Sequence, residues 1–168
     1  MGSSKFARFF KHRIWDEADA RRAVPAEARS RLAARVAASE KTHSGQIRVC
    51  VEASLPLRYL RHGATARQRA VVLFGKLGVW DTEHNNGVLI YLLLAERAIE
   101  VVADRGLHAR ADVWPGLVAG LSAALKQDRF EEGLAEAVDA VGALLAAEFA
   151  RTPGQPVRNE LSDEVVLL

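Results

Sequence analysis

A dense group of polar side chains stands immediately before the longest apolar run of this sequence. Asp81, Glu83, His84, Asn85 and Asn86 occupy the stretch DTEHNN, and GVLIYLLL follows directly. Carboxylate and amide oxygens suit a hard cation such as Ca²⁺ or Mg²⁺, whereas imidazole beside carboxylate suits zinc or another transition metal. The same residue types are also ordinary turn chemistry. The stretch is therefore either a divalent metal site or the turn that leads into a buried strand.

A second polar stretch, DRGLHARAD at 104–112, is expected at the same edge of the predicted sheet. The segments GVLIYLLL and IEVVAD flank AERA and predict a β-hairpin. If its turn centres near Glu96, Val88 lies opposite Asp104, so the two polar stretches meet. The candidate metal ligands are then Asp81, Asn85, Asn86, Asp104 and Asp112, and the candidate acid or base groups are His84 and His108.

Spacing patterns that would specify a reaction are not found in the sequence. It contains no EF-hand loop, no HExxH, no Gly-x-Ser-x-Gly elbow and no P-loop. Cys50 is the only cysteine and falls within a strand-like stretch, where a small buried hydrophobe is expected. His43, in the loop THSG, could approach the same sheet edge, and a solvated loop histidine is the alternative. Asp112 could equally serve as a helix cap.

The elements that must position these residues follow from periodicity and from helix-start signals. QIRVCVEA at 46–53 alternates, which predicts a half-buried strand with Ile47, Val49 and Val51 facing inward. TARQ at 65–68 is a capping box that begins a helix. The other expected elements are a helix after Pro25, strands at 87–94 and 99–104, and two amphipathic helices at about 113–126 and 130–149.

This order of elements predicts an α/β fold. The first two strands with their intervening helix form a crossover unit, which should be right-handed and parallel, and the third strand pairs antiparallel with the second. We therefore expect an α/β/α sandwich: a small mixed sheet with helices on both faces. The expected organisation is a basic aromatic arm at 1–24, a domain at 25–150 and a tail at 151–168 that is mobile except where its apolar end could dock.

The arm is the most unusual part of the composition. Phe6, Phe10 and Ile14 fall at helical spacing among basic residues. The arm either packs on the domain as a short helix or lies on anionic lipid or a protein partner. The residues that would make such a contact are Phe6, Phe9, Phe10, Lys11, Arg13 and Trp15.

Composition restricts the location and the partners. The 168-residue chain has a formal net charge of +2 and one cysteine, which fits a reducing compartment. Its first residues lack the apolar region of a secretory signal, and no apolar run approaches the roughly 20 residues of a membrane span. A soluble cytoplasmic protein, in peripheral contact with the inner membrane if the arm binds lipid, is expected. Arginines and aromatics do not interleave outside the arm, so nucleic-acid binding is not predicted.

Three stretches resemble the TPM domain family, also called TPM phosphatase: KTHSGQIRVCVEASL, VWDTEHNNGVLIYLLLAERAIEVVADRGLH and RFEEGLAEAVDAVGALLAAEFA. The likeness spans roughly Pro25 to Phe149 and is greatest to the short, soluble bacterial branch. It implies an α/β/α sandwich with an edge where some members bind calcium. Many members carry Asp-Asn-Gly at one loop and Gly-Tyr-Gly at the other, where this chain has Asn85-Asn86-Gly87 and Asp104-Arg105-Gly106.

Two functions follow as hypotheses. Some family members are accessory factors of membrane proteins or act in photosystem repair, and together with the basic arm this favours an accessory domain that acts through protein partners near the membrane. The alternative is a divalent-metal-dependent phosphatase, the activity attributed to a plant relative. It would use Ca²⁺ or Mg²⁺ at the polar edge.

Overall fold

The computed structural model describes residues 2–110, 113–152, 154, 156 and 158–168. Its centre is a four-stranded sheet in the order β3-β2-β1-β4. Parallel pairing joins β1 to β2 and β1 to β4, while β3 pairs antiparallel with β2. The strands are β1 (Gln46–Glu52), β2 (Gly87–Leu93), β3 (Ala98–Ala103) and β4 (Val166–Leu167).

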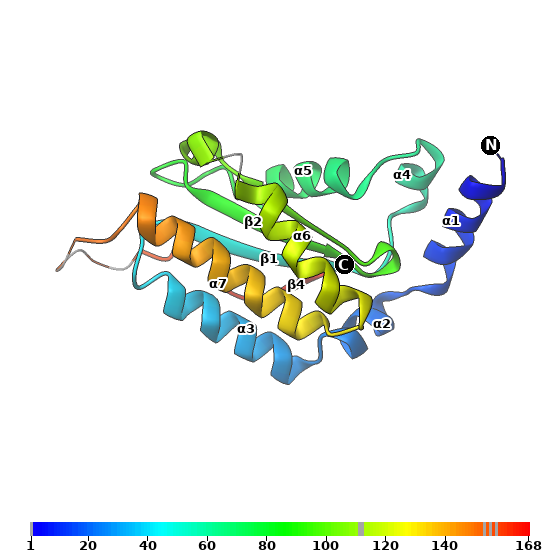
Figure 1. Cartoon of the computed structure of the whole chain (residues 1–168), viewed down its shortest axis with the longest axis horizontal. Helices are drawn as coiled ribbons and strands as arrows, with labels where there is room; N and C mark the ends of the chain where they lie inside the picture. The colour runs from blue at the N-terminus through cyan, green and yellow to red at the C-terminus, as the bar shows by residue number, and fades with distance from the viewer. Residues whose placement is uncertain (1, 111–112, 153, 155, 157) are drawn as a thin grey trace.

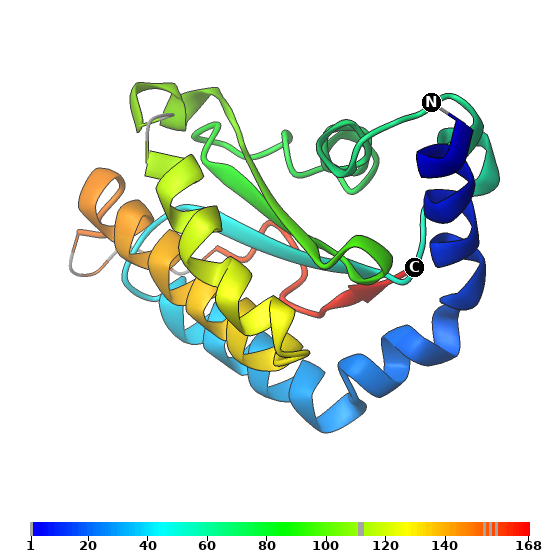
Figure 2. The same cartoon turned by 45° about the vertical axis from the view of Figure 1, so that its right-hand side comes forward.

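Helices cover both faces of this sheet, which confirms the predicted α/β/α sandwich (Figures 1 and 2). One face is covered by α2 (Glu17–Ala23), α3 (Ala26–Ser39), α6 (Val113–Lys126) and α7 (Phe130–Glu148). The other is covered by α4 (Leu57–Arg61) and α5 (Ala66–Lys76), and α1 (Gly2–Ile14) stands at one end beside α4. The capping box of α5 forms as predicted, because Thr65 accepts from the Gln68 amide and Gln68 accepts from that of Thr65.

Strand alternation divides the core into two apolar layers. Ile47, Val49 and Val51 pack toward α3 and α7, as predicted. The expectation that β1 is only half-buried was wrong, because α4 and α5 enclose its other face as well. Cys50 is fully buried there and Glu52 is 2% exposed. Alternation predicts that Glu52 lies on a polar face of β1. Its carboxylate is instead buried against Tyr91 of β2 and Arg69 of α5.

The hairpin between β2 and β3 forms, but the predicted register was wrong by one residue. Val88 pairs with Ala103 rather than with Asp104. The connection is the four residues Leu94 to Arg97: a 3₁₀ turn, η1 (Leu94–Glu96), followed by Arg97 in the left-handed region at φ 48°. Because this loop has four residues, the centre of the hairpin falls on the bond between Ala95 and Glu96 and not on Glu96 itself.

The end of the tail docks on the outer edge of β1, which was expected only of its apolar residues. The side chain of Gln46 accepts from the Glu160 and Leu161 amides at 2.7 and 3.0 Å and donates to the Arg158 carbonyl. The chain then continues into β4, where the Leu168 amide donates to the Val51 carbonyl. Edge strands need such cover, since their unpaired backbone groups otherwise recruit other strands.

Candidate functional site

The polar turn is built by its own side chains and backbone. Asn85 takes a positive φ of 52°, a conformation that Asn tolerates better than most residues. Thr82 accepts from the Asn86 amide through its hydroxyl at 3.1 Å and from the Asn85 amide through its carbonyl. The Gly106 amide donates to the Asn85 carbonyl at 2.9 Å. The two polar stretches therefore do share one sheet edge.

The described candidate metal ligands and acid or base groups lie at this edge, but they do not converge on one point. Asp81 and His84 are exposed. Asn85 accepts from Arg105 Nε at 2.9 Å, and one Asp104 carboxylate oxygen accepts from the Arg105 amide at 2.7 Å. His108 lies in the 3₁₀ segment η2 (Arg105–Arg110), but its side chain falls outside the described part of the structure, as does the whole of Asp112.

Two buried oxygens at this edge lack a hydrogen-bond partner: Asn86 Oδ1 and Asp104 Oδ2. Within the described part of this edge, these two oxygens are the observation that favours a cation. Alternation separates them, however. Asn86 follows the side of Val88 and donates to Ser44 Oγ, whereas Asp104 comes after the inward Ala103 and so turns to the α5 side. Among the described residues no three acidic, histidine or cysteine side chains come together, so these residues do not fit a calcium site with its six to eight oxygens.

Calcium, magnesium or zinc at millimolar concentration should therefore leave the thermal unfolding midpoint unchanged. A ligand that prefers the native state must raise the midpoint, and Asp104 is the described candidate carboxylate with a buried, unpaired oxygen at this edge. Thermal scans of the wild type and an Asp104→Asn variant, with and without each metal, measure this. A rise of several degrees in the wild type that the variant loses would contradict the expectation.

A hydroxyl–imidazole pair that the sequence interpretation missed lies between the end of α3 and the start of β1. His43 is fully buried rather than solvated, and its Nδ1 donates to the Gly45 carbonyl at 3.0 Å. Its other nitrogen then accepts from Ser39 Oγ at 2.9 Å. Burial lowers the pKa of His43 to about 4 against the opposing effect of the Gly45 bond, and Arg151 lowers it further. The spacing Ser39-x-x-x-His43 at a helix end was the available signal.

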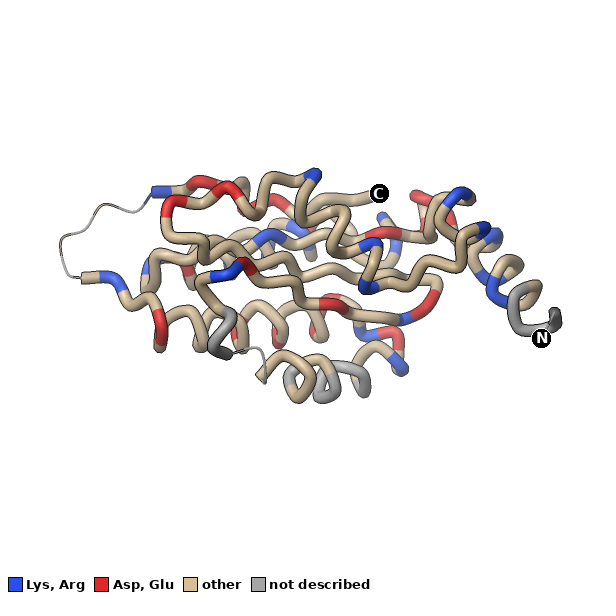
Figure 3. The backbone as a smooth tube through the Cα atoms, turned by 90° about the horizontal axis from the view of Figure 1, so that it is seen from above, with Lys and Arg blue, Asp and Glu red and all other residues tan. Residues whose placement is uncertain are grey.

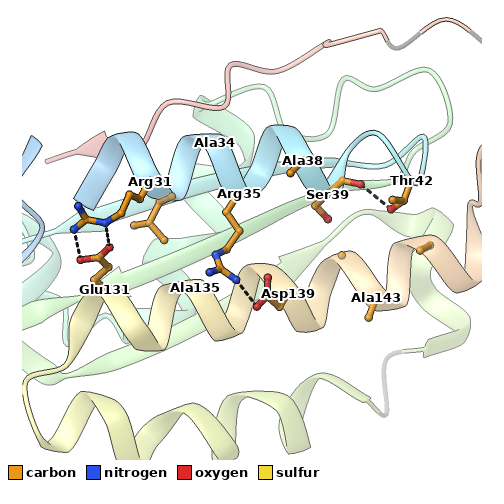
Figure 4. A pocket seen from close by; sticks show the side chains of 13 residues that line it. Arg31, Ala34, Arg35, Ala38, Ser39, Thr42, Glu131, Ala135, Asp139 and Ala143 are labelled. Carbon is orange, nitrogen blue, oxygen red and sulfur yellow. Dashed lines mark hydrogen bonds and ion pairs between the residues drawn. The ribbon is translucent and has the colours of Figure 1, made fainter. Parts of the chain in front are cut away.

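The surroundings of this pair indicate helix packing rather than nucleophilic catalysis. Ser39 lines a groove of about 710 Å³ between α3 and α7, which the ion pairs Arg31–Glu131 and Arg35–Asp139 bridge (Figure 4). A Cβ on Gly142 would lie 2.1 Å from Ser39 Oγ, so the hydroxyl is pressed against the backbone of α7. An imidazole with so low a pKa is also a weak base at neutral pH.

Two further buried titratable groups have shifted pKa values. Glu40 is 2% exposed and accepts from the Ile47 amide at 2.8 Å, so a side chain covers the start of the β1 edge. Burial raises the pKa of Glu40 to about 7, with Asp163 and Glu160 adding to the effect, while the Ile47 bond and Arg151 oppose it. Burial also raises the pKa of the Cys50 thiol to about 12, so Cys50 is protonated and unreactive at neutral pH.

The arm is helical, as its spacing predicts, but its aromatic residues differ in their surroundings. Phe6 and Phe10 are 69% and 63% exposed, and Phe9 contacts Phe10 edge to face with ring centroids 6.3 Å apart. Lys11 and Arg13 are exposed. Trp15 packs against the core instead.

The family profile for the TPM domain matches residues 18–144, which is more than half of the chain. The fold is similar to the NMR structure of the BA42 protein from the psychrophilic bacterium Bizionia argentinensis. That likeness has a TM-score of 0.73 at 25% sequence identity and covers 86% of this chain and 94% of BA42. Among proteins with curated descriptions no significant match is found.

The chain therefore belongs to the TPM domain family. The family match begins after α1 and ends before the tail that forms β4. Within the described residues, no helix is both long enough and apolar enough to cross a membrane.

Proposed function

We propose that this TPM domain is an accessory domain that acts by binding protein partners and not through a reaction of its own. The observation that carries the proposal is an exposed apolar strip formed by α5 and the turn that follows it. Val71, Val72 and Trp80 are 50%, 36% and 55% exposed. Gly75 lies on the same helix, and a Cβ added there would meet no atom within 4 Å.

The position of the strip supports this function. Helix α5 forms the outermost layer on its side of the sheet (Figures 1 and 2). Its inner side packs on the sheet through Ala70 and Leu73, so the strip is surplus to the core. An exposed Trp is typical of protein interfaces, where aromatic anchors carry much of the binding energy.

The alternative, a metal-dependent phosphatase, receives less support from the described residues. Its ligands would be Asp81, Asp104 and Asp112, with His84 or His108 as acid or base. Of these, Asp81 and His84 are exposed, and one oxygen of Asp104 is held by the neighbouring backbone. No pair of them is joined by a described contact that would position a metal-bound water.

Photo-crosslinking in cells tests the protein-binding function. A photoreactive residue at position 72 or 80 should give discrete protein adducts, while one at the exposed Lys126 on the opposite face should not. With the probe at position 72, Trp80→Ser should reduce the adduct more than about tenfold, the loss typical of an interface anchor. Equal labelling at all three positions, or no discrete adduct at 72 and 80, would overturn the proposal.

A further inference from the structure

Helix α1 is attached to the domain through its polar side. Arg8 Nε donates to Glu96 at 2.7 Å, and another guanidinium nitrogen donates to the Ala64 carbonyl at 2.6 Å. His12 is 3% exposed; its Nδ1 accepts from the Leu55 amide at 3.1 Å, and its Nε2 lies 2.9 Å from Glu96. These contacts fix which side of the helix faces inward.

The opposite side of α1 is therefore an apolar stripe turned to solvent. Phe6, Phe10 and Ile14 succeed one another at intervals of four residues and are 69%, 63% and 77% exposed. A helix that packs on its own domain normally buries such a stripe. Here the contacts of Arg8 and His12 hold the apolar side of the helix toward solvent. The stripe therefore has a fixed orientation, unlike the side chains of a frayed terminus.

Helix α4 extends the same surface. Leu57 is 46% exposed, and a groove of about 500 Å³ separates the two helices. Figures 1 and 2 both show α1 and α4 side by side at the end of the molecule away from the polar turn. The groove is lined by Phe6, Arg8, Phe9, Leu60, Arg61, His62 and Gly63.

The charge of this surface has one sign. Neither residues 1–15 nor residues 53–63 contain an Asp or Glu, although together they contain six Lys and Arg. Lys11 and Arg13 on α1 and Arg58 and Arg61 on α4 are exposed. Figure 3 shows blue and no red segments along the described part of α1. Glu96, the nearby carboxylate, is paired with Arg8 and His12.

We infer that α1 and α4 form a docking surface for an anionic lipid bilayer. An apolar stripe flanked by cations is the pattern of helices that lie in the membrane interface. The 13 residues of α1 span about 20 Å, which is too short to cross the hydrocarbon core. Phe6, Phe10 and Ile14 enter the acyl boundary, and the four cations meet lipid phosphates. This surface is separate from the α5 strip, so the inference goes beyond the proposed function.

Sedimentation with vesicles tests the inference. The probes are vesicles of phosphatidylcholine with about a third phosphatidylglycerol, compared with vesicles of phosphatidylcholine alone. Wild-type protein should sediment with the anionic vesicles, and high salt should release it because surface charge is screened. Phe6→Ser with Phe10→Ser should lower the partition coefficient at least about tenfold. Arg58→Gln with Arg61→Gln should lower it about 25-fold, since one cation contributes about fivefold.

The matched control is Trp80→Ser, which removes an aromatic that is also more than half exposed, after the far end of α5, and should not change partitioning. All substituted side chains are exposed, so the thermal midpoints should stay near that of the wild type. Failure to sediment with anionic vesicles overturns the inference, as does equal binding of the Phe or Arg variants. A photoreactive residue at position 10 that gives a discrete protein adduct, without vesicle binding, would assign the surface to a protein and leave the α5 test unaffected.

Discussion

Replacing Arg69 by Met is expected to lower the free energy of unfolding by about 3–5 kcal/mol, the usual loss when one partner of a buried ion pair is removed. Arg69 and Glu52 are 6% and 2% exposed. The guanidinium donates to the carboxylate at 2.6 and 2.9 Å, and Tyr91 donates to it at 2.6 Å. Without Arg69, the Glu52 carboxylate must stay buried with one neutral donor or take up a proton.

The double variant Arg69→Met with Glu52→Gln separates the charge from the packing. Most of the lost stability should return, because the uncompensated charge is gone while volume and the Tyr91 hydrogen bond are largely kept. Arg67→Met is the control on the same helix. Its ion pair with Glu100 is 3.8 Å long and half-exposed, so less than about 1 kcal/mol is expected. Urea unfolding measures all three, and a loss below 1 kcal/mol for Arg69→Met would refute the assignment.

The same cluster shows what sequence periodicity could and could not predict. Alternation in QIRVCVE correctly oriented Ile47, Val49 and Val51, and the uninterrupted apolar run correctly identified β2 as a strand buried on both faces. Alternation also implied that Glu52 faces water. A charged residue on a strand is ambiguous, because a partner 17 residues away can neutralise it inside the core. The pairing of Glu52 with Arg69 is a tertiary contact between β1 and α5, so local sequence periodicity does not predict it.

For the candidate site, the sequence predicted the shared sheet edge correctly and the strand register incorrectly. Hairpin geometry brought the two polar stretches to one edge because local turn chemistry dominates there. The register was wrong by one residue, since the left-handed Arg97 has no sequence signal comparable to Gly. This one-residue shift in register decides whether Asp104 and Asn86 share a face of the sheet. For α1, spacing predicted the helix and its stripe, but only the contacts of Arg8 and His12 show that the stripe faces outward.

Substituting Glu40 by Gln should reverse part of the pH dependence of stability. The pKa of Glu40 is raised from 4.5 to about 7. Between these values the native state holds a proton that the unfolded state has released, so this group's contribution falls as pH rises through the window and is constant above pH 7. The shift corresponds to about 3 kcal/mol. Gln keeps an oxygen for the Ile47 amide without a charge, so Glu40→Gln should be stabilised by up to about that amount at pH 8.

His43 acts in the opposite direction on nearly the same window. Its pKa is lowered from 6.5 to about 4, so the unfolded state holds the extra proton, and stability is lost as pH falls through this range. Between pH 4.5 and 6.5 the two groups oppose each other in the wild type. Relative to the wild type, Glu40→Gln should therefore gain stability as pH rises from 4.5 to 7, and His43→Gln should lose stability as pH rises from 4 to 6.5.

Urea unfolding of the three proteins at intervals between pH 4 and 8 measures these slopes, and comparison with the wild type cancels all other titrating groups. The opposite signs are the decisive result, because a general loss of packing in either variant would shift the curve without tilting it. Asp139→Asn serves as the control: its exposed ion pair with Arg35 should leave the slope near that of the wild type. If both substitutions at positions 40 and 43 give curves parallel to the wild type, the two buried groups do not titrate as their surroundings require.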